Sequence, residues 1–403
     1  MITFLSIFLV FLGTNLLLIN SNGENIYPLY YGILSLPYIV SYFWVIFVSK
    51  QQFSLNRIIT FFFLLKLYIV YMVIQYDVLA TYWLEIGETG DIHRFHIPEG
   101  LSVKNLGNIF HYLFSSEVAW SGKLTHVIIF LNARFLHFLG FSFPQLGYYE
   151  VGLITYIFNV FINIFTIWLV YLAALQYSKS ILFAQRAAFF IAFNPFFIYA
   201  AATAKKEAIL MFALSIFLLY ITQPIKKHYL FLIALLIVAF DRVYMVPFLI
   251  LIYGIISGNM KTLFILGGVG LIGIHFLFGL EKIFTLYTNY MNAVNLSNSA
   301  ISENNIFYNL LRALFSPSVT KLFSLDYFSG DLYLFLYYSL SLFFSVVAIR
   351  SLFIVKGLES IVFYTYLYVF ILLPYASTFK LMVLSVFAVI FLDRISFVKF
   401  NRK

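Results

Sequence analysis

The sequence contains no cysteine and very little charge. Because the chain has no thiol group, it cannot form a disulfide bond or a thiolate metal site, and it cannot use a cysteine nucleophile. Only 10% of the 403 residues are charged, against about 25% in an average soluble domain. Because long stretches carry no charge at all, we expect most of the chain to lie where an unpaired charge is costly, which excludes a soluble enzyme.

The sequence motifs of soluble catalysis are also absent. There is no glycine-rich phosphate loop, no His-Glu-x-x-His metal motif, no Gly-x-Ser-x-Gly elbow and no repeat of fixed period. The net charge of +9 raises the question of nucleic acid, but the basic residues are scattered between apolar runs and are not clustered on a soluble face. We therefore expect no nucleic-acid partner and attribute the basic residues to membrane topology.

Apolar and aromatic residues are abundant instead, at 63% hydrophobic and 21% aromatic. Apolar runs of about 17–25 residues predict transmembrane helices. We predict an all-α, polytopic integral membrane protein with about twelve transmembrane helices, in which residues 1–403 form a single transmembrane domain. The first run lacks the basic start and the small-residue end of a signal peptide, so it is counted as a span. The predicted spans lie near 2–19, 29–49, 58–79, 150–176, 181–202, 208–223, 229–240, 243–257, 262–279, 331–349, 357–375 and 379–393.

The positions of the charges predict the orientation of these spans. If the amino terminus is cytoplasmic, lysine and arginine concentrate on the cytoplasmic side and the opposite side is slightly acidic, as the positive-inside rule requires. Both termini are then cytoplasmic, and two long loops, about 80–149 and 280–330, are extracytoplasmic. The first loop includes an amphipathic stretch from Leu124 to Leu139, which we expect to form a helix in the membrane interface.

Three features of the spans leave alternatives open. The run 229–240 is too brief to cross a bilayer, so it either extends through Lys227 and Asp241 or pairs with 243–257 as a re-entrant hairpin. Asn194-Pro195 falls within the span 181–202, where proline is expected to bend the helix. Lys66, in the middle of a span, either needs a partner or a wet cavity or extends towards the interface.

Several basic residues lie on the outer side, where such residues are disfavoured. The Lys205-Lys206-Glu207 run interrupts a strongly apolar stretch, and Asp241-Arg242 ends the short seventh span. These positions share one membrane level, which predicts an anion site for the head group of a polyprenyl diphosphate. The alternative is that the residues only extend to the interface or neutralise Glu207 and Asp241 locally. The predicted diphosphate-binding residues are Arg94, Lys205, Lys206, Arg242, Arg312 and Lys380, with Arg134 in the loop above.

The first outer loop supplies acids that could accept a proton from a sugar hydroxyl. Asp91, after a glycine and before Arg94, is the candidate general base. Glu85, Glu88 and Glu207 compete for that role, and a solvated charged loop is the alternative.

Histidines of the same loop were weighed as metal ligands. His93 and His96 have no third ligand and no fixed helical spacing, so we expect no metal and no cofactor. His126 and His137, on the amphipathic stretch, are interpreted as packing or hydrogen-bonding groups.

These features together resemble a known family. A many-span, aromatic-rich chain with an early outer loop containing Gly-Asp, then "NP…KKEA", a basic residue before Val-Tyr and a late "LLRALFSP" is similar to Wzy-type O-antigen or capsule polymerases and to related membrane proteins with the glycosyltransferase-C kind of fold. By motif, the resemblance covers Asp91, Lys205, Glu207, Arg242 and Arg312.

The resemblance implies transfer of glycan repeat units from undecaprenyl diphosphate to an acceptor glycan, at the outer face of the bacterial cytoplasmic (inner) membrane. It implies a metal-independent reaction in the synthesis of lipopolysaccharide or capsule, with arginines gripping the diphosphate leaving group. The candidate catalytic residues remain Asp91 and Glu207, argued from the residues themselves. The implied partners are the lipid-linked oligosaccharide, the bilayer and a chain-length regulator protein.

Two other functions remain open from the sequence. A transferase of the glycosyltransferase-C kind, using a polyprenyl-phosphate sugar, would share the cluster of cations. A polysaccharide flippase or transporter, which is not an enzyme, would place charges through the whole membrane depth and often shows an internal repeat.

Overall fold

The described part of the chain is all-helical. The computed structural model describes residues 54–76, 96–103, 105–114, 122–140, 148–192, 194, 206–257, 268, 358, 360–362, 364–365, 383 and 385–392. Over these residues it contains α-helices and short 3-10 helices and no β-strand, which confirms the predicted all-α class. The elements are α3 (Leu55–Tyr76), α5 (Ile97–Leu101), α6 (Asn108–Phe114), α7 (Lys123–Phe138), α8 (Tyr148–Ser178), α9 (Ile181–Ala192), α11 (Glu207–Thr222), α12 (His228–Asp241), η4 (Val243–Met245), α13 (Val246–Ser257) and η5 (Val389–Phe391).

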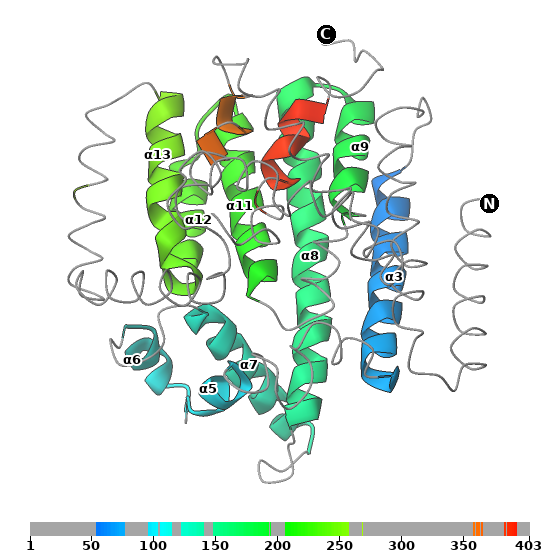
Figure 1. The fold of residues 1–403 in the computed structure, drawn as a ribbon, viewed down its shortest axis with the longest axis vertical. Helices are drawn as coiled ribbons and strands as arrows, with labels where there is room; N and C mark the ends of the chain where they lie inside the picture. The colour runs from blue at the N-terminus through cyan, green and yellow to red at the C-terminus, as the bar shows by residue number, and fades with distance from the viewer. Residues whose placement is uncertain are drawn as a thin grey trace, which may run out of the picture.

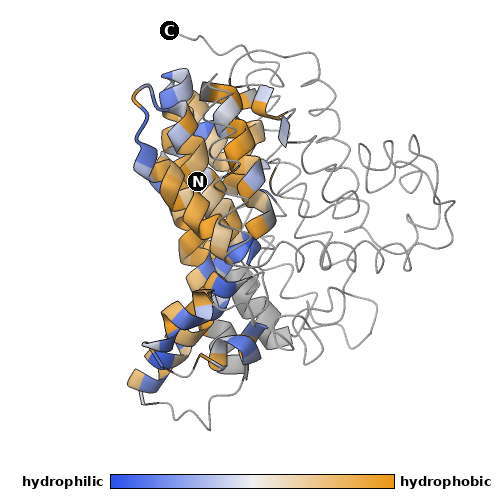
Figure 2. Ribbon diagram, turned by 90° about the vertical axis from the view of Figure 1, so that its left-hand side faces the viewer, coloured by the Kyte–Doolittle hydropathy of each residue, from blue (hydrophilic) through white to orange (hydrophobic). Residues whose placement is uncertain are grey.

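The helices form a bundle with a smaller group at one end. Helices α3, α8, α9, α11, α12 and α13 run roughly side by side, whereas α5, α6 and α7 gather below them (Figure 1). Helix α8 contacts α3, α9 and α11 along the bundle and also reaches α7. Figure 2 shows apolar residues along the bundle, with hydrophilic residues in the lower group and at the level where the two meet.

Helix α11 is the most deeply buried element of the bundle. Its sequence is apolar around the whole circumference, and nearly all side chains from Ala208 to Thr222 are buried, as expected of a helix surrounded by other helices. The helix begins at Glu207, whose negative charge suits a helix amino terminus. It ends just before Pro224, since proline cannot continue a helix.

A tight turn joins α8 to α9. Lys179 adopts a left-handed conformation with φ 59°, and the Ser180 hydroxyl accepts a hydrogen bond from the Phe183 amide at 3.3 Å, which caps α9.

One described helix is long and apolar enough to cross a membrane. It spans Ile154–Ser178, with 25 residues and a mean hydropathy of 2.0, so its length of about 38 Å exceeds the roughly 30 Å hydrocarbon core of a bilayer. The shorter apolar helices are Ile181–Ala192, Glu207–Thr222, His228–Asp241 and Val246–Ile256.

Predicted spans and observed helices coincide over much of the described chain. The spans near 58–79, 150–176 and 208–223 match α3, α8 and α11 within a few residues. The spans near 2–19, 29–49 and 331–349 lie outside the described residues, and only short pieces of those near 262–279, 357–375 and 379–393 are described. The total of about twelve spans therefore stays a prediction.

The predicted span 181–202 is described only up to Asn194, and residues 195–202 lie outside the described residues. Helix α9 ends at Ala192, and Asn194 is not helical, because a residue before proline is disfavoured in the helical conformation. The Asn194 side chain donates a hydrogen bond to the Ser385 hydroxyl. Helix α9 therefore ends before the proline, and the bend expected at Asn194-Pro195 stays a prediction.

Helices α12 and α13 form an antiparallel hairpin. The chain leaves α12 at Asp241, passes through η4 and returns in α13, so that the rings of Phe231 and Tyr253 stack with centroids 4.7 Å apart. Of the two alternatives for the run 229–240, the helix does extend to Asp241 but begins at His228, directly after Lys227. The re-entrant placement of the hairpin in a membrane stays a prediction.

The first predicted outer loop contains three helices. The amphipathic stretch from Leu124 to Leu139 is confirmed as α7, and α5 and α6 pack against it. Its placement in the membrane interface stays a prediction, and the second predicted loop, about 280–330, lies outside the described residues. Lys66 is fully buried in α3, with its Nζ 4.3 Å from the centre of the Phe62 ring, a cation–π distance.

Candidate functional site

Two oppositely charged side chains meet where the bundle joins the α5–α7 group. Helices α11 and α12 are connected by a short turn at their far end, so the start of α11 and the end of α12 lie at the same level. Glu207 opens α11, Arg242 follows α12, and the two side chains form an ion pair. Their side chains retain 17% and 10% exposure, so the pair is shielded from water without being sealed.

The start of α7 is joined to this ion pair through Asp241. The Gly122 amide donates to the Asp241 carbonyl at 2.9 Å, and the Thr125 hydroxyl donates to the Asp241 carboxylate at 3.0 Å. Asp241 is 1% exposed, and of its two carboxylate oxygens only Oδ1 accepts a hydrogen bond, while Oδ2 is buried without one in the structure. The turn that carries Arg242 is thereby fixed to the start of α7.

Gly122 allows three segments to approach closely. Its φ is +90°, a conformation that side chains disfavour. A β-carbon at this position would lie 3.3 Å from His96 Cε1 and 3.4 Å from Lys206 Cδ. His96, at the entrance to α5, and Lys206, before α11, are therefore neighbours across this glycine.

A chain of hydrogen bonds extends from His96 into the α5–α7 group. His96 Nδ1 lies 2.8 Å from His126 Nε2, and His126 Nδ1 lies 2.6 Å from the Tyr112 hydroxyl. The Glu99 carboxylate lies near enough to the Tyr112 phenol to act on its pKa. The four side chains come from α5, α6, α7 and the residue before α5.

Burial and charge keep both imidazoles neutral. Burial, followed by the charges of Lys206, His126 and Arg242, lowers the pKa of His96 to about 3, with Glu207 acting in the opposite direction. Burial, with Lys206 and Lys123, likewise lowers the pKa of His126 to about 3. Burial and the Glu99 carboxylate raise the pKa of Tyr112. All three groups are uncharged at neutral pH.

The structure brings together part of the site predicted from the sequence. Lys206, Glu207 and Arg242 lie within electrostatic reach of one imidazole. The local neutralisation of Glu207 that we considered as an alternative is also present, as its ion pair with Arg242. Asp91, Arg94, Lys205, Arg312 and Lys380 lie outside the described residues, as do Glu85, Glu88 and His93.

Arg134 does not join this cluster. It lies on α7 about 17 Å from Lys123 along the helix, and its guanidinium stacks over the Phe130 ring at 5.2 Å.

Sequence reasoning missed the chain of Tyr112, His126 and His96. The interpretation of His126 as a packing or hydrogen-bonding group is confirmed, but its partners were not predicted, because no residue spacing connects it to His96, 30 positions away. Among the described residues, no group of three or more His, Asp or Glu side chains forms a metal-ligand cluster. The one sequence feature that points to this contact is Gly122, since a glycine directly before an amphipathic helix allows another segment of the chain to approach the backbone closely.

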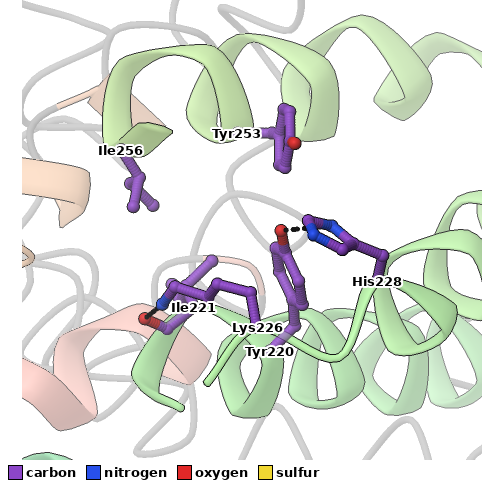
Figure 3. Close-up of a pocket in the computed structure, with 6 residues that line it drawn as sticks. All are labelled: Tyr220, Ile221, Lys226, His228, Tyr253 and Ile256. Atoms are coloured by element: carbon purple, nitrogen blue, oxygen red, sulfur yellow. Dashed lines mark hydrogen bonds between the residues drawn. The ribbon is translucent and has the colours of Figure 1, made fainter. Parts of the chain in front are cut away.

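A pocket of about 110 Å³ lies at the opposite end of the bundle. It is lined by Tyr220, Ile221, Lys226, His228, Tyr253 and Ile256, with Tyr220 and His228 hydrogen-bonded to each other (Figure 3). Tyr220 and Glu207 are separated by about 20 Å along α11. The pocket is therefore separate from the polar cluster.

Comparisons of the chain with protein families, with curated proteins and with solved structures find no match. The assignment of a function therefore depends on the residues and their geometry.

Proposed function

We propose that this protein is a Wzy-type polysaccharide polymerase that transfers undecaprenyl-diphosphate-linked repeat units at the outer face of the bacterial inner membrane. The observation that carries the proposal is the cluster of Lys206, Glu207 and Arg242. The cluster lies at one end of an apolar bundle, where the bundle joins the α5–α7 group. This is the depth at which the charged head group of a membrane-embedded lipid would lie.

The chemistry of the cluster suits a departing diphosphate. When the bond between the anomeric carbon and the diphosphate breaks, negative charge collects on the leaving group, and cations already in place stabilise it most in the transition state. Arg242 offers a planar set of donors for paired phosphate oxygens, and Lys206 adds a point charge. Glu207 holds the Arg242 guanidinium in position until the substrate competes for it.

Exposed apolar side chains support a membrane environment for the bundle. Phe161, Phe165 and Trp168 on α8 are 44–55% exposed, and Leu232 and Leu236 on α12 are 54% and 48% exposed. Side chains of this size in a row along a helix favour lipid contact. Within the proposal, both termini are cytoplasmic and the α5–α7 group is extracytoplasmic.

The other sequence-predicted residues keep their roles within the proposal. Arg94, Lys205, Arg312 and Lys380 are further diphosphate ligands, and Asp91 is a catalytic acid. Glu207 is the second acid, and its described position is as the partner of Arg242. The bilayer and a chain-length regulator protein are the proposed partners besides the lipid-linked oligosaccharide.

A matched set of Arg242 variants in a deletion strain tests the proposal. Deletion of the gene should collapse the ladder of surface polysaccharide on a gel to a single repeat unit. Complementation with Arg242→Ala should fail to restore the ladder, and Arg242→Lys should restore it only in part, because lysine cannot grip two phosphate oxygens in one plane. Arg57→Ala, which removes an exposed arginine of α3, should restore the ladder fully and serves as the control.

The same gel separates the alternative functions. Loss of even the single repeat unit in the deletion strain would indicate the single-sugar transferase or the flippase. A full ladder with Arg242→Ala, at normal protein level in the membrane, would overturn the assignment of Arg242 to the diphosphate.

A further inference from the structure

The proposed reaction needs a group that accepts a proton. The attacking hydroxyl of the acceptor sugar loses its proton as its oxygen bonds to the anomeric carbon, while the bond to the diphosphate breaks and its electron pair leaves with the diphosphate. Glu207 is paired with Arg242, and a carboxylate held in an ion pair is a weaker base.

We infer that His96 is the general base of the proposed transfer and that His126, Tyr112 and Glu99 are positioning residues behind it. This inference rests on the proposed function and gives His96 the role of general base, for which the sequence offered Asp91 and Glu207. Two observations support it. His96 lies beside Lys206, across Gly122, and His96 Nδ1 begins the chain of hydrogen bonds to His126 and Tyr112.

The direction of the hydrogen bonds fixes the proton positions. The Glu99 carboxylate acts on the Tyr112 phenol and raises its pKa, and because a carboxylate can only accept, the Tyr112 hydroxyl in the inferred chain donates towards it. The Tyr112 oxygen then accepts from His126 Nδ1, which leaves His126 Nε2 to accept from His96 Nδ1. His96 Nε2 is consequently the unprotonated nitrogen, and it has no hydrogen-bond partner among the described residues.

The chain also solves a problem of charge. Lys206 and Arg242 disfavour an imidazolium at His96, so a lone histidine here would be a poor base. If Nε2 takes the hydroxyl proton while the Nδ1 proton passes to His126, the His126 Nδ1 proton passes to Tyr112 and the phenol proton passes to Glu99. The positive charge then never stays beside the cations, and every atom and proton is accounted for.

Bound substrate should also make His96 a stronger base. The diphosphate brings negative charge to Lys206 and Arg242, which cancels much of their effect on His96. The base is thus weak in the empty site and stronger in the loaded one. The charged groups that face His96 are Lys206, Glu207 and Arg242, and this balance follows from their positions.

The test uses purified full-length protein in lipid nanodiscs, with repeat units on undecaprenyl diphosphate extracted from the deletion strain. His96→Gln, which keeps a similar shape without a base, should lower kcat about 10²–10⁴-fold and leave the KM for the lipid-linked donor unchanged. Tyr112→Phe keeps the ring and should lower kcat less, also at unchanged KM. His137→Gln, an exposed histidine of α7, should behave as wild type.

Binding of undecaprenyl diphosphate alone separates this inference from the proposed function. His96→Gln and Tyr112→Phe should bind it as wild type does, which also shows that they fold, whereas Arg242→Ala should not bind. A wild-type kcat for His96→Gln would overturn the base and leave the polymerase assignment intact. An equal loss of kcat and of binding in Tyr112→Phe would show a structural role and overturn the chain. Absence of polymer from the wild-type protein would overturn both.

Discussion

The two ends of α11 and α12 are built on different principles. At one end, Glu207 and Arg242 pair across 35 positions of sequence, and Thr125 bonds Asp241 across 116 positions. At the other end the rings of Phe217, Tyr220, Phe231 and Tyr253 stack on one another, and the polar bonds are mostly local.

The difference concerns what each end contributes. An aromatic stack gains stability from burial and shape and needs no charge. A cluster of charges and neutral histidines costs desolvation energy, so its partners must be placed well for it to persist. We therefore assign stability to the aromatic end and chemistry to the polar end, and changes at each end should affect different measurements.

Phe217→Ala should have the largest effect on stability and none on catalysis. Phe217 is fully buried and contacts Tyr220, Phe231 and Phe387, so truncation should cost about 3–5 kcal/mol. Thermal unfolding in nanodiscs measures the loss. The kcat of the folded variant should equal that of wild type. A lowered kcat at a temperature where the variant is folded would show that the aromatic end also contributes to catalysis.

Acid should weaken the polar end selectively. The pKa of His96 and of His126 is lowered to about 3 in the fold, against about 6.5 in an unfolded chain. Between these values the unfolded state binds more protons, so stability is fully present above about pH 6.5 and is lost as pH falls towards about 3, by up to about 1.4 kcal/mol per pH unit for each histidine.

The matched variant sharpens this second prediction. The double variant His96→Gln, His126→Gln lacks both titrating groups, so its melting temperature should change less between pH 7 and pH 4.5 than that of wild type. His137→Gln should retain the wild-type pH dependence. Equal pH dependence of wild type and the double variant would show that the histidines are not held neutral.

The sequence predicted the bundle better than the site. Apolar runs report directly on burial, so α8 and α11 were found within a few residues of their ends. The level shared by Glu207 and Arg242 also followed from alternating spans. The pairing of His96 with His126 did not, because it depends on how α5 and α7 pack, and no periodicity within either segment encodes that contact. The early end of α9 could have been anticipated, since a residue before proline rarely continues a helix.

The smallest expected effect on stability concerns the turn between α8 and α9, which belongs neither to the polar end nor to the aromatic end of α11 and α12. Lys179 has φ 59°, a left-handed conformation that costs a residue with a side chain about 1–2 kcal/mol, and glycine adopts it without that cost. Because glycine also gains freedom in the unfolded chain, Lys179→Gly should stabilise the protein by about 1 kcal/mol or less. Thermal unfolding of the variant, with polymerisation measured alongside, checks this expectation. Lys179→Gln removes the charge and keeps the side chain, so it should give no gain. If both variants stabilised the protein equally, relief of charge and not of backbone strain would be the cause.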